Sequence, residues 1–570
     1  MKKISSYFIL FLAAAVMTGC SGLNKMKKNQ DTIRYEVTPK VLEAHGGIVG
    51  LTIKGEFPEK YFDKKATLTA TPVLVYDGGE TPYEKVQVLQ GEKVMANNQV
   101  ITYSGGSFTY NDIVPFKEEM RVAQLMLRVE ASRGAKTVVF EPVKLADGVI
   151  STSTLVQKHG RAVIMKDNFQ RIIPESKVAD IHYVINRSDI RSSELKGADI
   201  NELRAYIKEV DADPDRRFTT TVVSSYASPD GPITLNEKLS VNRGSAADRF
   251  IKREFTKIEA AKSGDFFDNI TTPEDWEGFR AAVENSSIRD KDLILRVLSM
   301  YSDPVVRERE IKNMSSAYEA LKDEILPKLR RSVMTVNVDK IGRTDEQILA
   351  LARSNPGELS VEEILYAPTL VTDLNEQLRF YQAAAQTYPK CIRAHNNIGH
   401  TLLALGRTDE AIRAFEAAKA INYNDEVKNN LAAAALVKGE LVNAEELYNS
   451  MTTQTPESRF GLGVIAITKG EYDNAVNLLG TAPCFNLALA QLLKGDVNRA
   501  KATLDAMTET CNGKAPYLKA VVGARLDDRN YMLAGLREAV GINPAFKAMA
   551  KTDMEMAKFF ADDTFRSLVQ

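Results

Sequence analysis

A short pattern recurs four times between residues 398 and 504, always in the same phase. Each copy opens with a pair of apolar or small residues. A glycine follows seven residues after the second member of the pair, and an alanine follows five residues after that glycine. The opening pairs are Ile398-Gly399, Leu431-Ala432, Leu462-Gly463 and Leu487-Ala488. Small residues let paired helices approach closely, and glycine commonly ends a helix. The pattern therefore predicts an array of helix pairs.

This phase resembles the tetratricopeptide (TPR) repeat. The pattern is continuously helical from about Thr344, and a degenerate last unit covers residues 517–544. The third and fourth openings are closer together than the others, which indicates that the unit around Ala482-Pro483 has lost helical turns. We predict an all-α TPR solenoid over residues 343–570. The resemblance implies a concave groove that offers a surface to an envelope protein partner.

A second pattern lies within residues 225–251, where four residues have the spacing N-x-x-L-S-x-x-R: Asn236, Leu239, Ser240 and Arg243. It follows a β-like run at residues 218–224 and a turn rich in Ser, Pro and Gly, and it leads into an amphipathic helix. In this context the motif resembles the C-terminal domain family of outer-membrane protein A (OmpA-like). The resemblance implies a small α/β domain that grips the peptide stem of peptidoglycan.

The resemblance also implies a site. In the family, an Asp before the motif receives the ammonium of diaminopimelate, and the motif Arg receives its carboxylate as a bidentate fork. Arg243 stands at the Arg position, but the Asp position holds Ser228, with Asp230 two residues later. Either Asp230 replaces the missing carboxylate, or Arg243 grips the stem without it, or the site has decayed. In the last case Asn236 and Arg243 serve the structure alone.

The predicted OmpA-like domain spans residues 170–342. Strands are expected at residues 178–185, 218–224 and 333–338, and helices at residues 199–210, 236–255 and 317–329. A charged, helical stretch separates the motif helix from the last unit. We therefore predict a helical insertion at about residues 256–316.

Residues 31–155 have the pattern of a β-sandwich. Several runs are rich in β-formers, and most of them alternate apolar with polar residues; these runs are residues 33–37, 48–53, 66–76, 85–89 and 124–130. Gly-Gly pairs at residues 46, 78 and 105 supply turns. No catalytic motif occurs in this region, and a role as a spacer is expected.

The N-terminus has the pattern of a lipoprotein signal. Met1-Lys2-Lys3 is followed by an apolar run at residues 7–16, which is too short to span a bilayer. The run ends in Met17-Thr18-Gly19-Cys20, which resembles a lipobox. The resemblance implies a signal peptide over residues 1–19 and acylation of Cys20, palmitate included. Residues 20–30 then form a polar tether. An ordinary secretory signal with an incidental cysteine is the alternative.

Composition argues against several other functions. The net charge is −1, so a nucleic-acid partner is not expected. Cys391, Cys484 and Cys511 lack metal-site spacing; either Cys484 and Cys511 form one disulfide, or all three are small buried helix residues. His395 and His400 are five residues apart without an H-E-x-x-H motif. No metal, cofactor or catalytic constellation is predicted, and we expect a protein that is not an enzyme.

These patterns predict a scaffold lipoprotein anchored in the outer membrane by lipid and facing the periplasm. It would bind peptidoglycan through the OmpA-like domain and a protein partner through the TPR groove. The alternative is an envelope assembly or secretion accessory that acts through the TPR repeats alone, with the OmpA-like site inactive.

Overall fold

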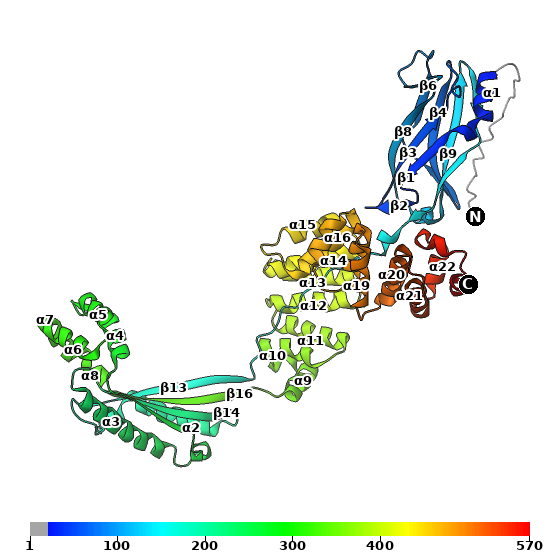
Figure 1. Ribbon diagram of the computed structural model, residues 1–570. Coiled ribbons are helices and arrows are strands. Elements are labelled where there is room, and N and C mark those ends of the chain that lie inside the picture. Colours follow the sequence, from blue (N-terminus) through cyan, green and yellow to red (C-terminus); the bar gives the residue numbers. More distant parts are fainter. Residues whose placement is uncertain (1–20) are drawn as a thin grey trace. The chain divides into compact units, whose positions relative to one another are not determined.

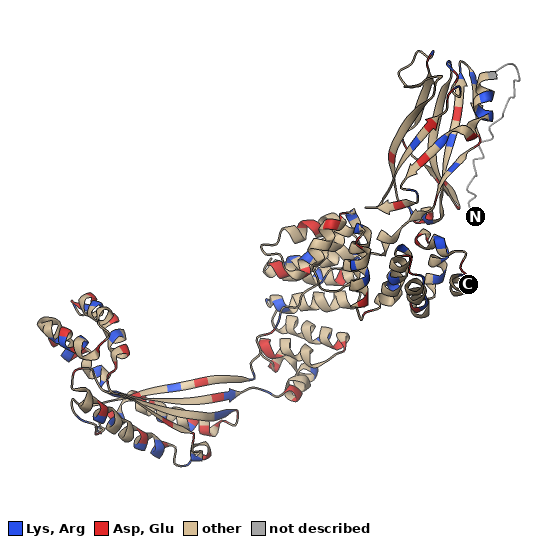
Figure 2. Ribbon diagram, viewed as in Figure 1, with Lys and Arg blue, Asp and Glu red and all other residues tan. Residues whose placement is uncertain are grey.

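The structure, a computed structural model, describes residues 21–570. It divides into two compact units, one formed by residues up to Met165 together with Tyr388–Gln570, and the other by Lys166–Thr387 (Figure 1). The signal peptide predicted over residues 1–19 and the lipid site predicted at Cys20 lie outside the described residues. Within the described part, none of the helices has the length and apolar character needed to cross a membrane. Acidic and basic side chains are interspersed along both units (Figure 2).

The N-terminal part of the first unit is β-rich, as predicted. One sheet has the order β1-β3-β2-β12 with β8 beside β3, and the other has the order β10-β9-β4-β6-β7 with β11 beside β9 and β5 beside β4. Both sheets contribute to one hydrophobic core, and strands such as β8 bury every second side chain. The strands are β1 (Arg34–Thr38), β2 (Leu42–His45), β3 (Ile48–Phe57), β4 (Thr67–Tyr76), β5 (Gly79–Pro82), β6 (Gln87–Gly91), β7 (Gln99–Ile101), β8 (Gly106–Pro115), β9 (Gln124–Arg133), β10 (Lys136–Val139), β11 (Val143–Asp147) and β12 (Val149–Ile150).

Residues 21–28 are not the polar tether that the sequence suggested. They form the helix α1 (Ser21–Lys28). Leu23 and Met26 are three residues apart, so they share one face of this helix, and both are buried in the β-rich core. The Tyr61 hydroxyl donates a hydrogen bond to the Met26 carbonyl at 3.0 Å. The described chain is therefore packed against the β-rich domain from its first turn.

The second unit contains a four-stranded sheet with the order β13-β16-β14-β15. β15 runs parallel to β14, and β16 lies antiparallel to β13 and β14. Two long helices, α2 and α3, cover one face and share its core (Figure 1). The elements are β13 (Ile172–His182), α2 (Ala198–Ala212), β14 (Arg216–Tyr226), α3 (Ile233–Glu254), β15 (Phe267–Thr272) and β16 (Arg331–Ile341). The expected strands are present, each longer than predicted, and so are the first two helices. The helix predicted at residues 317–329 is instead two shorter helices, which pack in a separate small core.

The predicted insertion is only partly helical. Its first part supplies the edge strand β15, whose alternation is masked in the sequence because most of its side chains are exposed. Five helices follow and bury a small core of their own around Phe279, Leu298 and Leu321. They are α4 (Trp276–Glu284), α5 (Lys291–Met300), α6 (Pro304–Asn313), α7 (Ser315–Glu324) and α8 (Leu326–Leu329). We call α4–α8 the helical insert.

Three helices that the sequence grouped with the repeats belong to the second unit: α9 (Asp345–Ser354), α10 (Val361–Tyr366) and α11 (Leu374–Thr387). The reason is contact with the chain just before β13. Arg171 forms an ion pair with Asp345, and the Phe169 and Tyr366 rings stack with centroids 4.5 Å apart. These contacts join α9 and α10 to the sheet.

The C-terminal part of the first unit is all-helical, and its helices alternate in the predicted phase. Each of the four recurrent glycines ends the first helix of its pair or follows it by two residues, with φ between 74° and 99°. Only glycine adopts such a left-handed conformation readily. The helices are α12 (Ile392–Ala404), α13 (Thr408–Ile421), α14 (Asp425–Lys438), α15 (Leu441–Asn449), α16 (Pro456–Lys469), α17 (Tyr472–Leu479), α18 (Phe485–Lys494), α19 (Val497–Asp505), α20 (Lys514–Arg525), α21 (Arg529–Ile542), α22 (Ala545–Ala550) and α23 (Asp563–Val569).

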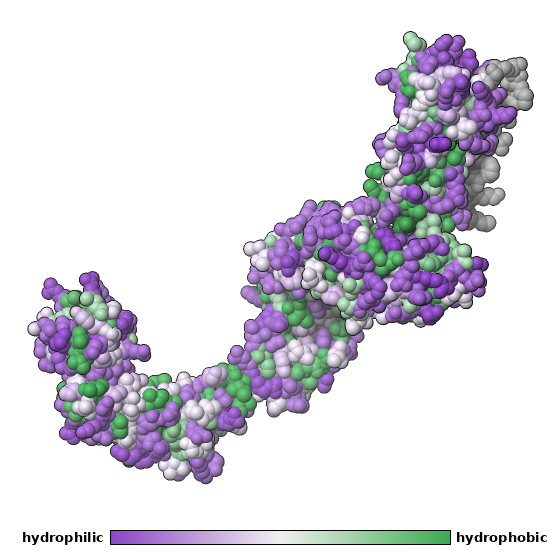
Figure 3. Space-filling model, in the orientation of Figure 1, coloured by the Kyte–Doolittle hydropathy of each residue, from purple (hydrophilic) through white to green (hydrophobic). Residues whose placement is uncertain are grey.

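The eight-residue α17 agrees with the predicted loss of turns near Ala482-Pro483. The three cysteines of the array, Cys391, Cys484 and Cys511, are free, partly buried thiols. The face of the molecule drawn in Figure 3 is mostly hydrophilic, with apolar patches of limited size.

The recurrent alanines predict the response to a buried charge. Ala411 and Ala444 are both fully buried. We expect Ala411→Glu or Ala444→Glu to cost about 3–5 kcal/mol, because each buries an unpaired carboxylate. At roughly 2–4 °C per kcal/mol, unfolding of the array should begin about 10 °C lower in a circular-dichroism melt. Ala534→Glu, at an exposed position of α21, is the matched control. Equal melting of all variants would contradict the repeat register.

Candidate functional site

Asn236 fixes the loop that the OmpA-like resemblance identified as the ligand site. This loop, residues 227–231, connects β14 to α3. The Asn236 amide donates to the Ser228 carbonyl at 3.2 Å and to the Gly231 carbonyl at 3.0 Å. The Asn236 side chain is buried, so both bonds lie inside the domain. Asn236 therefore shapes the loop and does not face solvent.

Arg243 is buried in the domain, with 1% of its surface exposed. Its Nε donates to the Arg187 carbonyl at 3.1 Å, and its Nη1 donates to the Tyr226 carbonyl at 2.8 Å. The guanidinium lies 5.2 Å from the centre of the Tyr183 ring. Burial lowers the pKa of Arg243 to about 10. The described bonds of the motif arginine are thus made to carbonyls of its own domain.

Ser228 and Asp230 form one hydrogen-bonded cluster with a second arginine. The Ser228 hydroxyl donates to the Asp230 carboxylate. Arg330 Nε donates to Ser228 Oγ at 3.2 Å, and Arg330 Nη2 lies 3.3 Å from Asp230 Oδ2. The Arg330 and Asp230 side chains are only 10% and 14% exposed. The carboxylate nearest the family's Asp position is therefore paired within the chain. Arg330, which directly follows the helix predicted at residues 317–329, was not among the predicted site residues.

The helical insert covers this cluster. Lys312 Nζ of α6 donates to the Asp230 carbonyl at 3.3 Å. The cavity between Pro229, Asp230, Trp276 and Phe279 has a volume of about 10 Å³, which is no more than one water molecule requires. The structure thus brings together all four predicted residues, Arg243, Asn236, Ser228 and Asp230, and engages each with groups of the same unit.

We expect Arg243→Ala to destabilise the second unit by roughly 2–4 kcal/mol, because it leaves two buried carbonyls without their charged donor. Arg243→Lys should not restore stability, since an ammonium cannot reproduce the planar fork. The measurement is hydrogen–deuterium exchange of α3 in the full chain. Arg249→Ala, at an exposed position of the same helix, is the control. Unchanged exchange in Arg243→Ala would contradict a structural role.

A second candidate site lies on the inner face of the helical array. Residues 155–165 run along this face, and we call them the strap; Leu155 ends a 3-10 turn, and no helix or strand follows it within the strap. Three asparagines of the array each bind both the N–H and the carbonyl of one strap residue. The pairs are Asn486 with Gln157 (3.0 and 3.0 Å), Asn430 with Val163 (2.7 and 2.8 Å) and Asn397 with Met165 (2.9 and 2.9 Å).

Two further asparagines complete this set, which we call the asparagine ladder. Asn429 Nδ2 donates to the Arg161 carbonyl at 2.8 Å, and Asn396 Nδ2 donates to the Val163 carbonyl at 3.0 Å. The ladder also bonds to itself, since Asn430 Nδ2 donates to Asn396 Oδ1 at 2.8 Å. All five side chains are at most 2% exposed. Each of these bonds to the strap is made to a main-chain atom. Every residue type offers a main-chain carbonyl, and every type except proline offers an N–H.

The ladder follows the repeat phase. Asn397, Asn430 and Asn486 each stand one residue before the opening pair of the first, second and fourth repeats. Lys514, at the start of α20, donates to the Leu155 carbonyl at 3.3 Å. The strap therefore runs from the last helix pair toward the first, opposite to the order of the repeats.

The third repeat interrupts the ladder, and nearby contacts to the strap depend on its side chains. It has Gly461 where the others have asparagine, and the Tyr448 ring lies against that glycine. A Cβ added to Gly160 of the strap would lie 2.6 Å from Ala433 Cα and 2.6 Å from Tyr448 Oη. The Arg161 guanidinium lies 4.1 Å from the centre of the Phe460 ring. This part of the groove therefore leaves no room for a side chain at residue 160 and places an aromatic ring beside residue 161.

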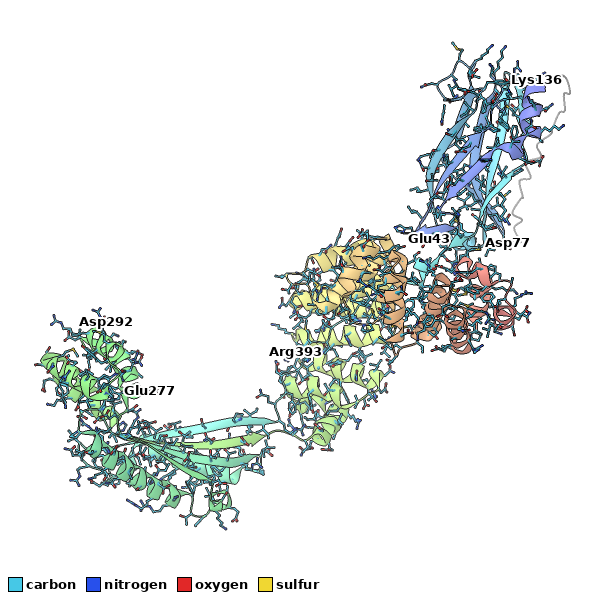
Figure 4. All side chains as sticks on the ribbon, viewed as in Figure 1. Glu43, Asp77, Lys136, Glu277, Asp292 and Arg393 are labelled. Atoms are coloured by element: carbon cyan, nitrogen blue, oxygen red, sulfur yellow. The ribbon has the colours of Figure 1, made fainter. Side chains whose placement is uncertain are left out.

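The N-terminal end of the strap joins the β-rich domain to the array. Leu155 and Val156 are buried in the hydrophobic core of the array. Just before them, the Thr152 hydroxyl donates to Glu555 at 2.6 Å, and Arg525 pairs with Glu555. Glu43 is labelled in Figure 4 at the end of the β-rich sheets, and its Oε1 lies 3.7 Å from Arg525 Nη2.

Sequence reasoning missed the ladder, although a signal was present. Asn-Asn pairs at residues 396–397 and 429–430 stand immediately before the opening pairs of two repeats. Recurrence of a polar pair at a position next to buried residues is informative, because asparagine is unfavourable inside a helix without a specific role.

Removal of one asparagine of the ladder should make the strap more mobile. Asn430→Ala leaves the Val163 N–H without its partner, and an unsatisfied buried group costs about 1–3 kcal/mol. We expect faster hydrogen–deuterium exchange in residues 157–165 of the full chain, at least fivefold by this energy. Asn498→Ala, at an exposed position of α19, is the control. Equal exchange in the two variants would show that the asparagines do not hold the strap.

Comparisons with known proteins agree with the helical repeats. A family model described as "Tetratricopeptide repeat" matches residues 392–425, which cover α12, α13 and the first residue of α14. A comparison with the curated proteins gives no match.

Several solved structures are similar over part of the chain. A tetratricopeptide repeat protein from Parabacteroides merdae has 16% identity, covers 37% of this chain and 91% of its own, and has a TM-score of 0.29. The APC/C hetero-tetramer Cut9-Hcn1 has 15% identity, 60% and 77% coverage and a TM-score of 0.30. Yeast Tom70 has 13% identity, 67% and 84% coverage and a TM-score of 0.27. On the family match and the helix pairs, the C-terminal part of this chain is a TPR repeat region, and such repeats indicate protein–protein interaction.

Proposed function

We propose that this protein is a lipid-anchored scaffold of the cell envelope that acts through protein–protein interaction, without enzymatic activity. The observation that carries the proposal is the TPR region, whose inner face holds an extended polypeptide by its main chain. Five asparagines on α12, α14 and α18 bind an extended segment of protein, which is a property expected of a scaffold.

The anchor in this proposal is acylated Cys20, in the outer membrane and facing the periplasm. It is supported by the sequence Met17-Thr18-Gly19-Cys20 after a short apolar run. Three or more acyl chains would hold the protein stably, since one chain alone gives marginal binding. The β-rich domain, which follows directly on α1, would then lie next to the membrane as a spacer.

Peptidoglycan binding by the OmpA-like domain is the second candidate. Its support is the motif of Asn236 and Arg243, together with the cluster of Ser228 and Asp230 at the end of β14. Its difficulty is Arg330, which already pairs with Asp230, and the helical insert that covers both. We therefore favour the version of the function in which the OmpA-like domain is structural and the TPR region binds the partner.

One fractionation series tests the anchor and the cell-wall site together. Wild type should remain in the outer-membrane fraction and incorporate labelled palmitate, whereas Cys20→Ala should do neither, because it lacks the thiol that is acylated. Purified Cys20→Ala protein is then sedimented with peptidoglycan. We expect it to stay in the supernatant, alone and with Ser228→Asp added, because Arg330 occupies the carboxylate.

Retention of Cys20→Ala in the membrane would contradict the lipid anchor. Sedimentation that is lost on Arg243→Ala, with Arg249→Ala as control, would restore the peptidoglycan-binding function. In-cell cross-linking of wild type, compared with a chain ending before residue 388, tests whether the partner depends on the TPR region.

A further inference from the structure

The strap is held by two different kinds of contact. Its first two residues, Leu155 and Val156, are buried among the apolar side chains of the array. From Lys158 to Met165 the side chains are half-buried or exposed, and the contacts to the array are mainly hydrogen bonds to the main chain. The first part is held by burial in the apolar core, whereas the second part is held as a bound peptide would be, through its main chain.

The resident segment leaves part of the groove unsatisfied. Among the residues that the structure describes, neither Tyr448 Oη nor Asn429 Oδ1 has a hydrogen-bond partner. Tyr448 is fully buried and Asn429 is 1% exposed, and both lie beneath the strap around Gly160 and Arg161. An unpaired buried polar atom is unfavourable, so a segment that bonded to either one would fit this groove better than the strap does.

We propose that residues 158–165 are a tethered, exchangeable ligand, and that the asparagine ladder binds an extended segment of a partner protein in their place. This inference rests on the proposed function and names the surface that the partner uses. The ladder binds main-chain atoms, so it places little restriction on the sequence of most of the partner segment. Where the second and third repeats meet, the segment carries glycine against Ala433 and Tyr448, followed by a basic residue over Phe460, as Gly160-Arg161 does.

Tethering makes the strap an internal competitor. A covalently attached segment acts at an effective concentration in the millimolar range. The apparent affinity of an external segment is lowered in proportion to the fraction of molecules whose groove is open. A change that weakens the strap without touching the ladder therefore strengthens binding of the external segment. If the strap were only a part of the fold, weakening it would not strengthen binding of an external segment.

The test uses the full chain and a fluorescent, end-blocked peptide with the sequence of residues 158–166. Gly160→Val places a branched side chain where a Cβ already lies 2.6 Å from the backbone of α14, which should open the groove. We expect this variant to bind the peptide at least tenfold more tightly than wild type in fluorescence anisotropy. Gly264→Val is the matched control, because a Cβ at Gly264 meets nothing within 4 Å. Adding Asn430→Ala to Gly160→Val should abolish the gain.

Arg161→Ala gives a second, milder variant, since it removes the cation over Phe460 without adding volume. It should also bind the peptide more tightly than wild type. A folded Gly160→Val or Arg161→Ala protein with wild-type affinity overturns the proposal. Loss of the array's helical signal in both variants overturns it too, because the strap is then an inseparable part of the fold. A partner that still cross-links to Asn430→Ala refutes this inference and leaves the proposed function standing.

Discussion

The first unit depends on pairing between side-chain amides and the main chain. A TPR array has an inner face lined by first helices, and here that face carries buried asparagines that would be costly without partners. The strap satisfies most of them, and in return the N–H and carbonyl groups of Gln157, Val163 and Met165 are paired without belonging to a sheet. Because Leu155 and Val156 enter the same core, the β-rich domain is joined to the array by packing as well as by covalent connection.

In the second unit, the residues of the N-x-x-L-S-x-x-R motif make structural contacts within their own unit. The motif arginine donates to two carbonyls, and the acidic residue near the expected position forms an ion pair with Arg330. Ion pairs of low exposure hold their geometry well but are disrupted at a high cost if one partner is removed. Arg330 also donates to the Ser228 hydroxyl, and Lys312 of the helical insert donates to the Asp230 carbonyl, so the loop is held from two sides.

Sequence patterns predicted those parts of the fold whose periodicity is local. The glycine and alanine phase located the repeat helices, and alternation located the strands of the β-rich domain. β15 was missed because its side chains are mostly exposed, so its sequence lacks apolar alternation. α1 was missed because an eight-residue helix with two buried side chains has too little pattern. The partners of Asp230 and Asn430 could not be predicted, since Arg330 and Val163 are distant in sequence and no periodicity links them.

The order of the strap and the array along the chain has a kinetic consequence. The bonds from the ladder to the strap close loops of 329, 267 and 232 residues. The whole second unit lies within these loops, so the strap leaves the ribosome long before any of the helices that bind it. Contacts of such high sequence separation slow folding, because loop-closure entropy must be overcome before they contribute. Docking of the strap is therefore a late step in the maturation of this chain, after the β-rich domain and the sheet of the second unit have formed on their own.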